Sequence, residues 1–399
     1  MEIFLAFLRL GVSSFGGPIA HLGYFNTEFV RRRKWLDEDT FAQIVALCQF
    51  LPGPASSQVG IIIGLIRGGI LGAMLAWLAF TLPSAILLVL FALGVARIPG
   101  VAEAPWIHGL LIAAVAVVAA AVVNMYGSLC PDVPRKVVAF VAAAIVLLLP
   151  VSGLVQLAVI ILAAIYGRLF IKPIQRTARP IPAVGNRVSA IVCAVAFVGL
   201  LVAFPLAQSF VHYGPFNVFG AFYESGALVF GGGHVVLPLL EARVVPPGWI
   251  DQNTFLAGYG AAQAVPGPLF TFAAYLGAAM HRPVSGVGGA ALALFAIYLP
   301  SFLLIAAILP FWNGLIERAE IGAALQGVNA AVVGILLAAL YQPVWVSAIH
   351  GSPDAALALL AFLALSELKA PPWLVVILCA LAAQALSYAG YGAIVPSLQ

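Results

Sequence analysis

Long apolar runs separated by short polar stretches dominate this chain. The runs fall at residues 4–25, 41–66, 70–96, 106–126, 137–150, 152–171, 188–206, 217–240, 253–280, 285–311, 321–346, 354–366 and 372–390. Most approach or exceed the length of about 20 residues that a helix needs to cross a bilayer. The strands of a membrane barrel would show short segments in which apolar and polar residues alternate. Continuous apolar runs such as Leu110–Val123 do not show this alternation. The pattern therefore predicts an all-α polytopic membrane protein.

The pattern also repeats. The stretch FLAFLRLGVSSFGGP, from Phe4, lies without gaps on FGAFYESGALVFGGG, from Phe219. The stretch WLDEDTFAQIVALCQFLPGP, from Trp35, lies on WIDQNTFLAGYGAAQAVPGP, from Trp249. Chance similarity between apolar segments matches Leu with Val, but it does not match Trp, Asp, Gln and Pro-Gly-Pro in register. We therefore predict two homologous halves.

A polar hinge, Gly167–Arg187, separates the halves. It holds five basic residues and no acid, namely Arg168, Lys172, Arg176, Arg179 and Arg187. Loops rich in Lys and Arg stay in the cytoplasm, so we place the hinge there. We expect a first membrane repeat at 1–180, a connecting span at 181–210 and a second membrane repeat at 211–399.

Composition narrows the function. Hydrophobic residues make up 63% of the 399 residues and charged residues only 8%, against about 25% charged residues in a soluble protein. No Walker A motif occurs, so any transport must be through a channel or by a gradient-driven carrier. The four cysteines stand alone, and neither they nor the histidines have metal-ligand spacing. We expect no enzyme activity, no cofactor and no bound metal, and the net charge of +4 does not indicate nucleic-acid binding.

Broken helices carry the candidate site. Proline and glycine interrupt a helix, and freed backbone groups inside a membrane must face protein or water. Breaks at matching places in two repeats are typical of a carrier's binding site. A helix that restarts after the break presents free N–H groups to an anion. The predicted substrate-binding residues are Gly16, Gly17, Pro18, Gln49, Pro52, Gly53, Pro54, Ser56, Ser57, Gly231, Gly232, Gly233, Gln263, Pro266, Gly267, Pro268 and Thr271.

Four titratable or charged residues lie near the breaks. Arg9 and Glu224 occupy equivalent places in the two halves. Either they pair with one another, or Arg9 helps to hold an anion while Glu224 exchanges a proton. His21 and His234 follow the glycine runs, either as neutral hydrogen-bonded groups or as proton-coupling groups.

At FGGP, FLPGP, FGGGHVVLP and AVPGP the chain resembles the chromate ion transporter family in its long, two-domain form. The resemblance implies export of chromate across the inner membrane of a bacterium, chromate resistance, and two halves in opposite orientation. Sulfate is the natural competing analogue. A midplane site with alternating access is the mechanism we expect.

Several alternatives stay open at this stage. The chain could carry sulfate or another small anion on the same scaffold, or form an anion channel. Residues 41–66 and 253–280 are either broken spans or re-entrant hairpins. Counting residues 4–25 as one span and both Pro-Gly-Pro segments as re-entrant gives parallel repeats, contrary to the family's inversion. The oligomeric state, with a homodimer as one candidate, is not fixed by the sequence.

Overall fold

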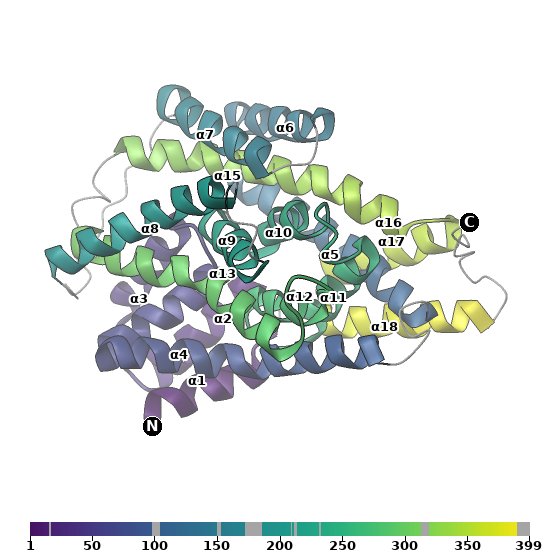
Figure 1. The fold of residues 1–399 in the computed structure, drawn as a ribbon, viewed down its shortest axis with the longest axis horizontal. Helices are drawn as coiled ribbons and strands as arrows, with labels where there is room; N and C mark the ends of the chain where they lie inside the picture. Colours follow the sequence, from purple (N-terminus) through teal and green to yellow (C-terminus); the bar gives the residue numbers. More distant parts are fainter. Residues whose placement is uncertain are drawn as a thin grey trace.

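A computed structural model describes residues 1–15, 17–97, 104–149, 153–171, 186–208, 210, 214–230, 233–312 and 319–388. Over these residues the chain is helical and has no strand (Figure 1). Five helices are long and apolar enough to cross a membrane. The predicted all-α polytopic membrane fold is confirmed.

The helices follow in chain order. They are α1 (Glu2–Ser13), α2 (Gly17–Phe25), α3 (Glu38–Phe50), α4 (Ala55–Arg97), α5 (Pro105–Leu129), α6 (Val133–Leu148), α7 (Gly153–Phe170), α8 (Arg187–Gln208), α9 (Gly214–Ala227), α10 (Val236–Val244), α11 (Gln252–Ala264), α12 (Phe272–Ala279), α13 (Gly286–Ile308), α15 (Ala319–Ala339), α16 (Val346–Ala348), α17 (Ser352–Ser366) and α18 (Pro372–Leu386).

The first hairpin consists of α1 and α2, the latter continued by a π-helical turn, Asn26–Arg32. These arms run antiparallel, because Glu2 at the start forms a 3.0 Å ion pair with Arg33 at the end. Near the middle, the rings of Phe7 and Phe29 lie 4.7 Å apart. Residues 4–25 therefore do not form the single span that the sequence suggested but fold back on themselves.

The second hairpin consists of α3 and the first part of α4. Its base is closed by the guanidinium of Arg67, 5.0 Å from the centre of the Trp35 ring. Gly68 and Gly69 then leave helical geometry, so α4 is two helices joined at a kink. The hairpin begins where the Asp37 carboxylate accepts the N–H of Thr40 at 2.8 Å, a helix N-cap.

The second half repeats both hairpins. In the third hairpin, α9 and α10 lie side by side, and Ser225 Oγ approaches Leu239 O at 3.5 Å. In the fourth hairpin, α11 and α12 run antiparallel, because the Tyr275 hydroxyl near the end donates to Thr254 O near the start at 3.0 Å. The base of the fourth hairpin is closed by His281 N–H, which donates to the carbonyl of Trp249 at 3.0 Å.

The second part of α4 runs from the base of the first pair of hairpins to the base of the second pair. Its start lies beside Ile3, whereas Phe91 near its end stacks on Tyr275 with ring centres 5.8 Å apart. α13 runs the other way, from the base of the fourth hairpin to a cluster of first-half residues that includes Phe7 and takes in Ile305. The two long helices are thus antiparallel, and they cross where Trp77 meets Tyr298 at 5.5 Å.

The outer helices are exchanged between the halves. α15 of the second half packs on α6 and α7 of the first half, and α5 of the first half packs on α17 and α18 of the second half (Figure 1). Glycines permit the close approach: a Cβ on Gly327 would lie 2.1 Å from Ala163 O, and one on Gly109 would lie 2.5 Å from Cys379 O. α5 is therefore a central helix, and 72% of its 18-residue apolar stretch is buried inside the protein.

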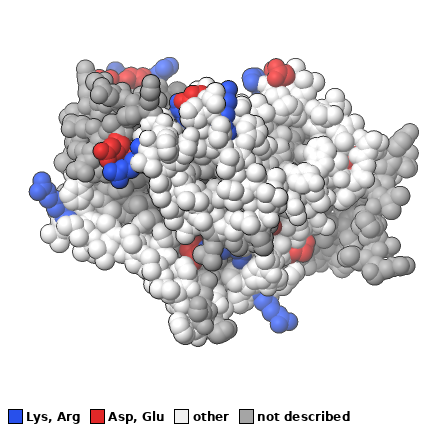
Figure 2. Space-filling view, turned by 90° about the horizontal axis from the view of Figure 1, so that it is seen from above, with Lys and Arg blue, Asp and Glu red and all other residues white. Residues whose placement is uncertain are grey.

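The connecting helix α8 lies at the periphery, because only 11% of its 18-residue apolar stretch is buried inside the protein. Figure 2 shows charged side chains in small groups around a wide uncharged surface. This distribution suits a protein surrounded by lipid, because charges at the centre of a bilayer are costly.

Two glycines of α15 give a matched stability test. Gly327→Ala should lower the thermal unfolding midpoint in detergent by several degrees, because overpacking costs about 1–3 kcal/mol. Gly322→Ala, where nothing lies within 4 Å of a new Cβ, should leave the midpoint unchanged or raise it, since Ala exceeds Gly in helix propensity by about 1 kcal/mol. Equal midpoints for the two variants would contradict the exchanged packing.

Candidate functional site

The tips of the hairpins meet in a reciprocal pair of hydrogen bonds. The N–H of Gly53, at the tip of the second hairpin, donates to Val229 O of the third hairpin at 2.6 Å. The N–H of Gly267, at the tip of the fourth hairpin, donates to Ser14 O of the first hairpin at 2.8 Å. Each Pro-Gly-Pro break therefore contacts the glycine-run break of the other half.

Both of these glycines have a backbone that disfavours other residues. Gly53 has φ +120° and Gly267 has φ +98°. A Cβ on Gly53 would lie 2.7 Å from Ser301 Oγ, and one on Gly267 would lie 2.9 Å from Ser84 Oγ. Ser84 and Ser301 are the equivalent serines of the two Leu-Pro-Ser motifs, so each crossing helix offers its serine to the tip from the other half.

A polar cluster surrounds the tip of the second hairpin. Gln58 is fully buried, and its Nε2 donates to Pro52 O at 2.7 Å and approaches Ser301 Oγ at 3.3 Å. Ser56 Oγ lies 3.3 Å from His21 Nδ1. Ser57 Oγ lies 3.5 Å from the hydroxyl of Tyr298. Polar side chains from α2, α4 and α13 thus gather at one buried place.

Several buried side-chain atoms near the hairpin tips have no hydrogen-bond partner among the described residues. They are Ser14 Oγ, His21 Nε2 and Gln58 Oε1, all buried. A buried polar group without a partner costs about 1–3 kcal/mol, so these groups are suited to contact water or a bound solute. When the Ser56 hydroxyl donates to His21 Nδ1, Nε2 carries the proton and can act as a donor.

The equivalent place in the fourth hairpin is apolar. Phe270, Thr271 and Phe272 occupy the positions of Ser56, Ser57 and Gln58. The Thr271 hydroxyl is already used, because it donates to Pro268 O at 2.7 Å. The first-half tip therefore has the polar groups that can coordinate a solute, and the second-half tip has aromatic rings.

The electrostatics of the tips favour an anion. α4 starts at Ala55, and its first N–H groups have no acceptor within the helix, which gives that end a partial positive charge. The carbonyls of Ser14 and Val229, at the ends of incoming arms, are occupied by Gly267 and Gly53 N–H groups. Two carbonyl oxygens, whose partial negative charge would repel an anion, are thus each occupied by a hydrogen bond.

The remaining predicted site residues have mixed positions. Pro52, Pro54, Pro266 and Pro268 lie at the tips, and Gln263 is half-buried with an unpartnered Nε2. Gln49 is exposed, and it does not join the buried cluster. Gly16, Gly231 and Gly232 lie outside the described residues, whereas Gly17 begins α2 with φ +76° and Gly233 begins a short 3₁₀ turn. Pro18 lies in the first turn of α2.

Glu224 does not pair with Arg9. The buried Glu224 forms an ion pair with Arg243 of α10, whereas Arg9 is exposed. Glu28 occupies the first-half position of Arg243, and it pairs with Arg33 at 2.6 Å. The charge order of the second half is thus reversed relative to the first half, and Glu224 is neutralised within its own hairpin.

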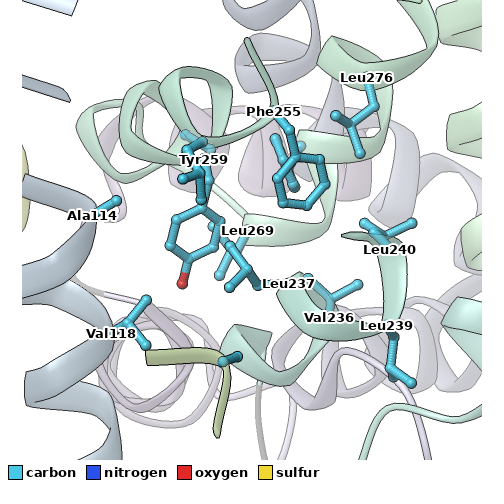
Figure 3. Close-up of a cluster of buried hydrophobic side chains, with 14 of the residues drawn as sticks. Ala114, Val118, Val236, Leu237, Leu239, Leu240, Phe255, Tyr259, Leu269 and Leu276 are labelled. Carbon is cyan, nitrogen blue, oxygen red and sulfur yellow. The ribbon is translucent and has the colours of Figure 1, made fainter. Parts of the chain in front are cut away.

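The two histidines have different surroundings. His21 belongs to the polar cluster. His234 Nδ1 lies 2.8 Å from the hydroxyl of Tyr259 on α11. Figure 3 shows Tyr259 among apolar side chains of α5 and α10, including Val118 and Leu237. His234 therefore helps to hold the third hairpin on the fourth.

Sequence reasoning missed three residues at the tips, although Gln58 was visible as a polar residue after the first Pro-Gly-Pro break. Ser84, Tyr298 and Ser301 were not among the predicted site residues, and all three are buried. The signal was present, because the Leu-Pro-Ser motif occurs at equivalent places in both halves. A polar residue within an apolar run, retained in two copies, marks a position where two repeats meet.

Comparison with known proteins identifies the family. The sequence model of the chromate transporter family matches residues 1–168 and again residues 216–384. The chain belongs to the chromate transporter family. Its family membership marks it as a transport protein of the membrane. No solved structure matches this chain.

Relatives of this chain are found in several bacteria. A probable chromate transport protein of Synechococcus elongatus is 27% identical over 94% of this chain and 93% of the relative. A chromate transport protein of Pseudomonas aeruginosa is 28% identical over 84% of this chain and 79% of the relative. One of Cupriavidus metallidurans is 26% identical over 85% of this chain and 81% of the relative.

Proposed function

We propose that the protein exports chromate from the cytoplasm and so confers chromate resistance, using an anion site where the hairpin tips meet. The observation that carries the proposal is the buried polar cluster at the reciprocal Gly53 and Gly267 hydrogen bonds. Family membership supports chromate as the transported anion. No cation is needed within the site, because hydroxyl, amide and backbone N–H groups can bind a tetrahedral oxyanion and still release it.

We infer that the site lies near the membrane midplane. α3 and α11 have 13 residues each, or about 20 Å of helix, against about 30 Å for the hydrocarbon layer. Arms of this length reach the interior without crossing it. The serines that contact the tips, Ser84 and Ser301, lie well inside the long helices α4 and α13.

The two halves are inverted in this proposal. The second part of α4 spans from one hairpin base to the other, and α13 spans back, so the two pairs of hairpins enter from opposite faces. The basic stretch Arg31–Lys34 and Arg67 lie at the base of the first pair. We assign that face to the cytoplasm, and the protein to the bacterial inner membrane.

Membrane potential suffices to drive export. Each charge that moves outward through 100 mV, negative inside, gains about 2.3 kcal/mol. A dianion therefore gains about 4–5 kcal/mol, which corresponds to an outward accumulation of about a thousandfold. Proton exchange is not required, and Glu224, one of the predicted coupling candidates, already forms an ion pair with Arg243.

Alternating access would occur at the tips. Because α5 and α15 are exchanged between the halves, the two repeats are poorly suited to rock as rigid bodies. We propose that the hairpins move against the outer helices. The reciprocal hydrogen bonds would then close the path on one side of the anion while it opens on the other.

Chromate uptake into inside-out vesicles tests this proposal. Uptake should saturate, should increase when the vesicle interior is made positive, and should be inhibited by excess sulfate. Vesicles without the protein provide the background rate. Absence of chromate uptake under every gradient would overturn the assignment. Sulfate uptake alone would assign the same scaffold to sulfate, and flux that does not saturate would indicate a channel.

A further inference from the structure

We propose that His108, His350 and Asp354 form a binding site for a divalent transition-metal ion such as Zn²⁺. The three residues come from the start of α5 and from the chain around the start of α17. Their ligand atoms all lie within 4.8 Å of one another. The site is remote from the hairpin tips, and it joins a helix of the first half to a helix of the second half.

The carboxylate is held ready to act as a ligand. Asp354 is buried in the first turn of α17, and its Oδ2 accepts the backbone N–H of His350 at 3.0 Å. This bond fixes the side chain and leaves Oδ1 facing His108. Metal-binding carboxylates and imidazoles are commonly oriented by such secondary hydrogen bonds.

The imidazoles do not form a simple hydrogen-bonded pair with the acid. His108 Nε2 lies 3.1 Å from Asp354 Oδ1, but the alignment gives no hydrogen bond, and this buried nitrogen has no other partner among the described residues. The His108 and His350 rings stack with centres 5.3 Å apart. Two neutral imidazoles this close can share one cation once one ring turns out of the stack, because each nitrogen lone pair lies in the plane of its ring.

The donor set selects the class of ion. Two imidazole nitrogens and one carboxylate oxygen suit Zn²⁺, Co²⁺ or Ni²⁺ rather than Ca²⁺ or Mg²⁺, which prefer oxygen ligands. Rotation of an imidazole about its side-chain bonds would bring the donors, which now lie within 4.8 Å of one another, to the 2.0–2.2 Å ligand distances of zinc. His350 is exposed, so a metal ion has a direct path from solvent and the fourth position remains open to water.

Bound metal would stabilise the packing of α5 on α17. An ion that binds only the folded protein raises its stability in proportion to RT ln(1 + [L]/Kd). Because both ligand helices contribute to the exchanged outer packing, zinc would fasten the two halves at the face where the third and fourth hairpins have their bases. This inference is independent of the proposed transport of chromate.

The test uses metal-free full-length protein in detergent, with Zn²⁺ and Mg²⁺ as probes. One equivalent of Zn²⁺ should bind in calorimetry and raise the unfolding midpoint, whereas Mg²⁺ should do neither. Co²⁺ should give visible absorption bands of a low-coordinate site. His350→Ala, an exposed change, should retain the fold and lose at least tenfold in affinity, as should Asp354→Asn. His281→Ala, another exposed histidine, is the matched control and should bind normally. Unchanged zinc affinity in His350→Ala, or no zinc binding at all, would overturn the site.

Discussion

Gly53→Ala is expected to reduce anion transport at least tenfold. The new Cβ would lie 2.5 Å from Gln58 Nε2 and 2.7 Å from Ser301 Oγ, at a residue whose φ is +120°. Backbone strain costs about 1–3 kcal/mol and overpacking about as much again, and each 1.4 kcal/mol is a factor of ten in population. The tip would therefore leave the geometry in which Gly53 reaches Val229.

The measurement is the initial rate of chromate uptake in vesicles, normalised to the amount of folded protein. Gly94→Ala, in the second part of α4 and with open space around the new Cβ, is the control and should transport at the wild-type rate. Gly267→Ala should show a smaller loss than Gly53→Ala, because its Cβ meets Ser84 Oγ alone closer than 3.0 Å. A wild-type rate for Gly53→Ala would remove the tips from the mechanism.

Gln58→Glu is expected to abolish transport of a dianion. The change keeps the shape of the side chain and places a negative charge in the buried cluster. At an effective dielectric constant of 20, a single and a double negative charge about 6 Å apart repel by about 5 kcal/mol. This repulsion corresponds to a loss of more than a thousandfold in affinity.

A matched control separates charge in the site from general damage. Gln156 is also a buried glutamine, and its Nε2 donates to Pro238 O at 3.2 Å, outside the polar cluster. Gln156→Glu should lower thermal stability by about as much as Gln58→Glu does, and it should retain transport.

The duplication offers a second comparison. Ser57→Ala should strongly impair transport, whereas Thr271→Ala should have little effect. Equal effects at both positions would contradict a site confined to the first-half tip.

The sequence predicted the fold class and the places of the breaks, because these follow from local physics. Proline and glycine end helices wherever they occur, and the aspartates before α3 and α11 cap them in the same way, each accepting a Thr N–H at 2.8 Å. The polar residues after the first Pro-Gly-Pro were also visible without a structure. Pairing between distant residues, such as Gly53 with Val229, was not.

The direction of the repeats depended on one segment. Residues 4–25 have the length and hydropathy of a span, and counting them as a span makes the repeats parallel. The contact of Glu2 with Arg33 instead returns this segment to its starting face. When one segment is a hairpin and not a span, every later helix crosses the membrane in the opposite direction. Hydropathy cannot distinguish a hairpin from a span of equal length. The pairing of Glu224 with Arg243 was missed for the same reason, since Arg243 becomes its neighbour only after α10 folds back.

The exchange of α5 and α15 between the halves bears on whether one half could fold as a separate polypeptide. A polypeptide that held one half alone would expose the glycine-lined face of its central helix, where Gly109 or Gly327 now meets a backbone from the other half. In the proposed inverted arrangement, two such fragments would complement one another only by inserting into the bilayer in opposite orientations. Fusion into one chain fixes their relative orientation and equal stoichiometry, and it allows the two tips to differ, polar in the first half and largely aromatic in the second.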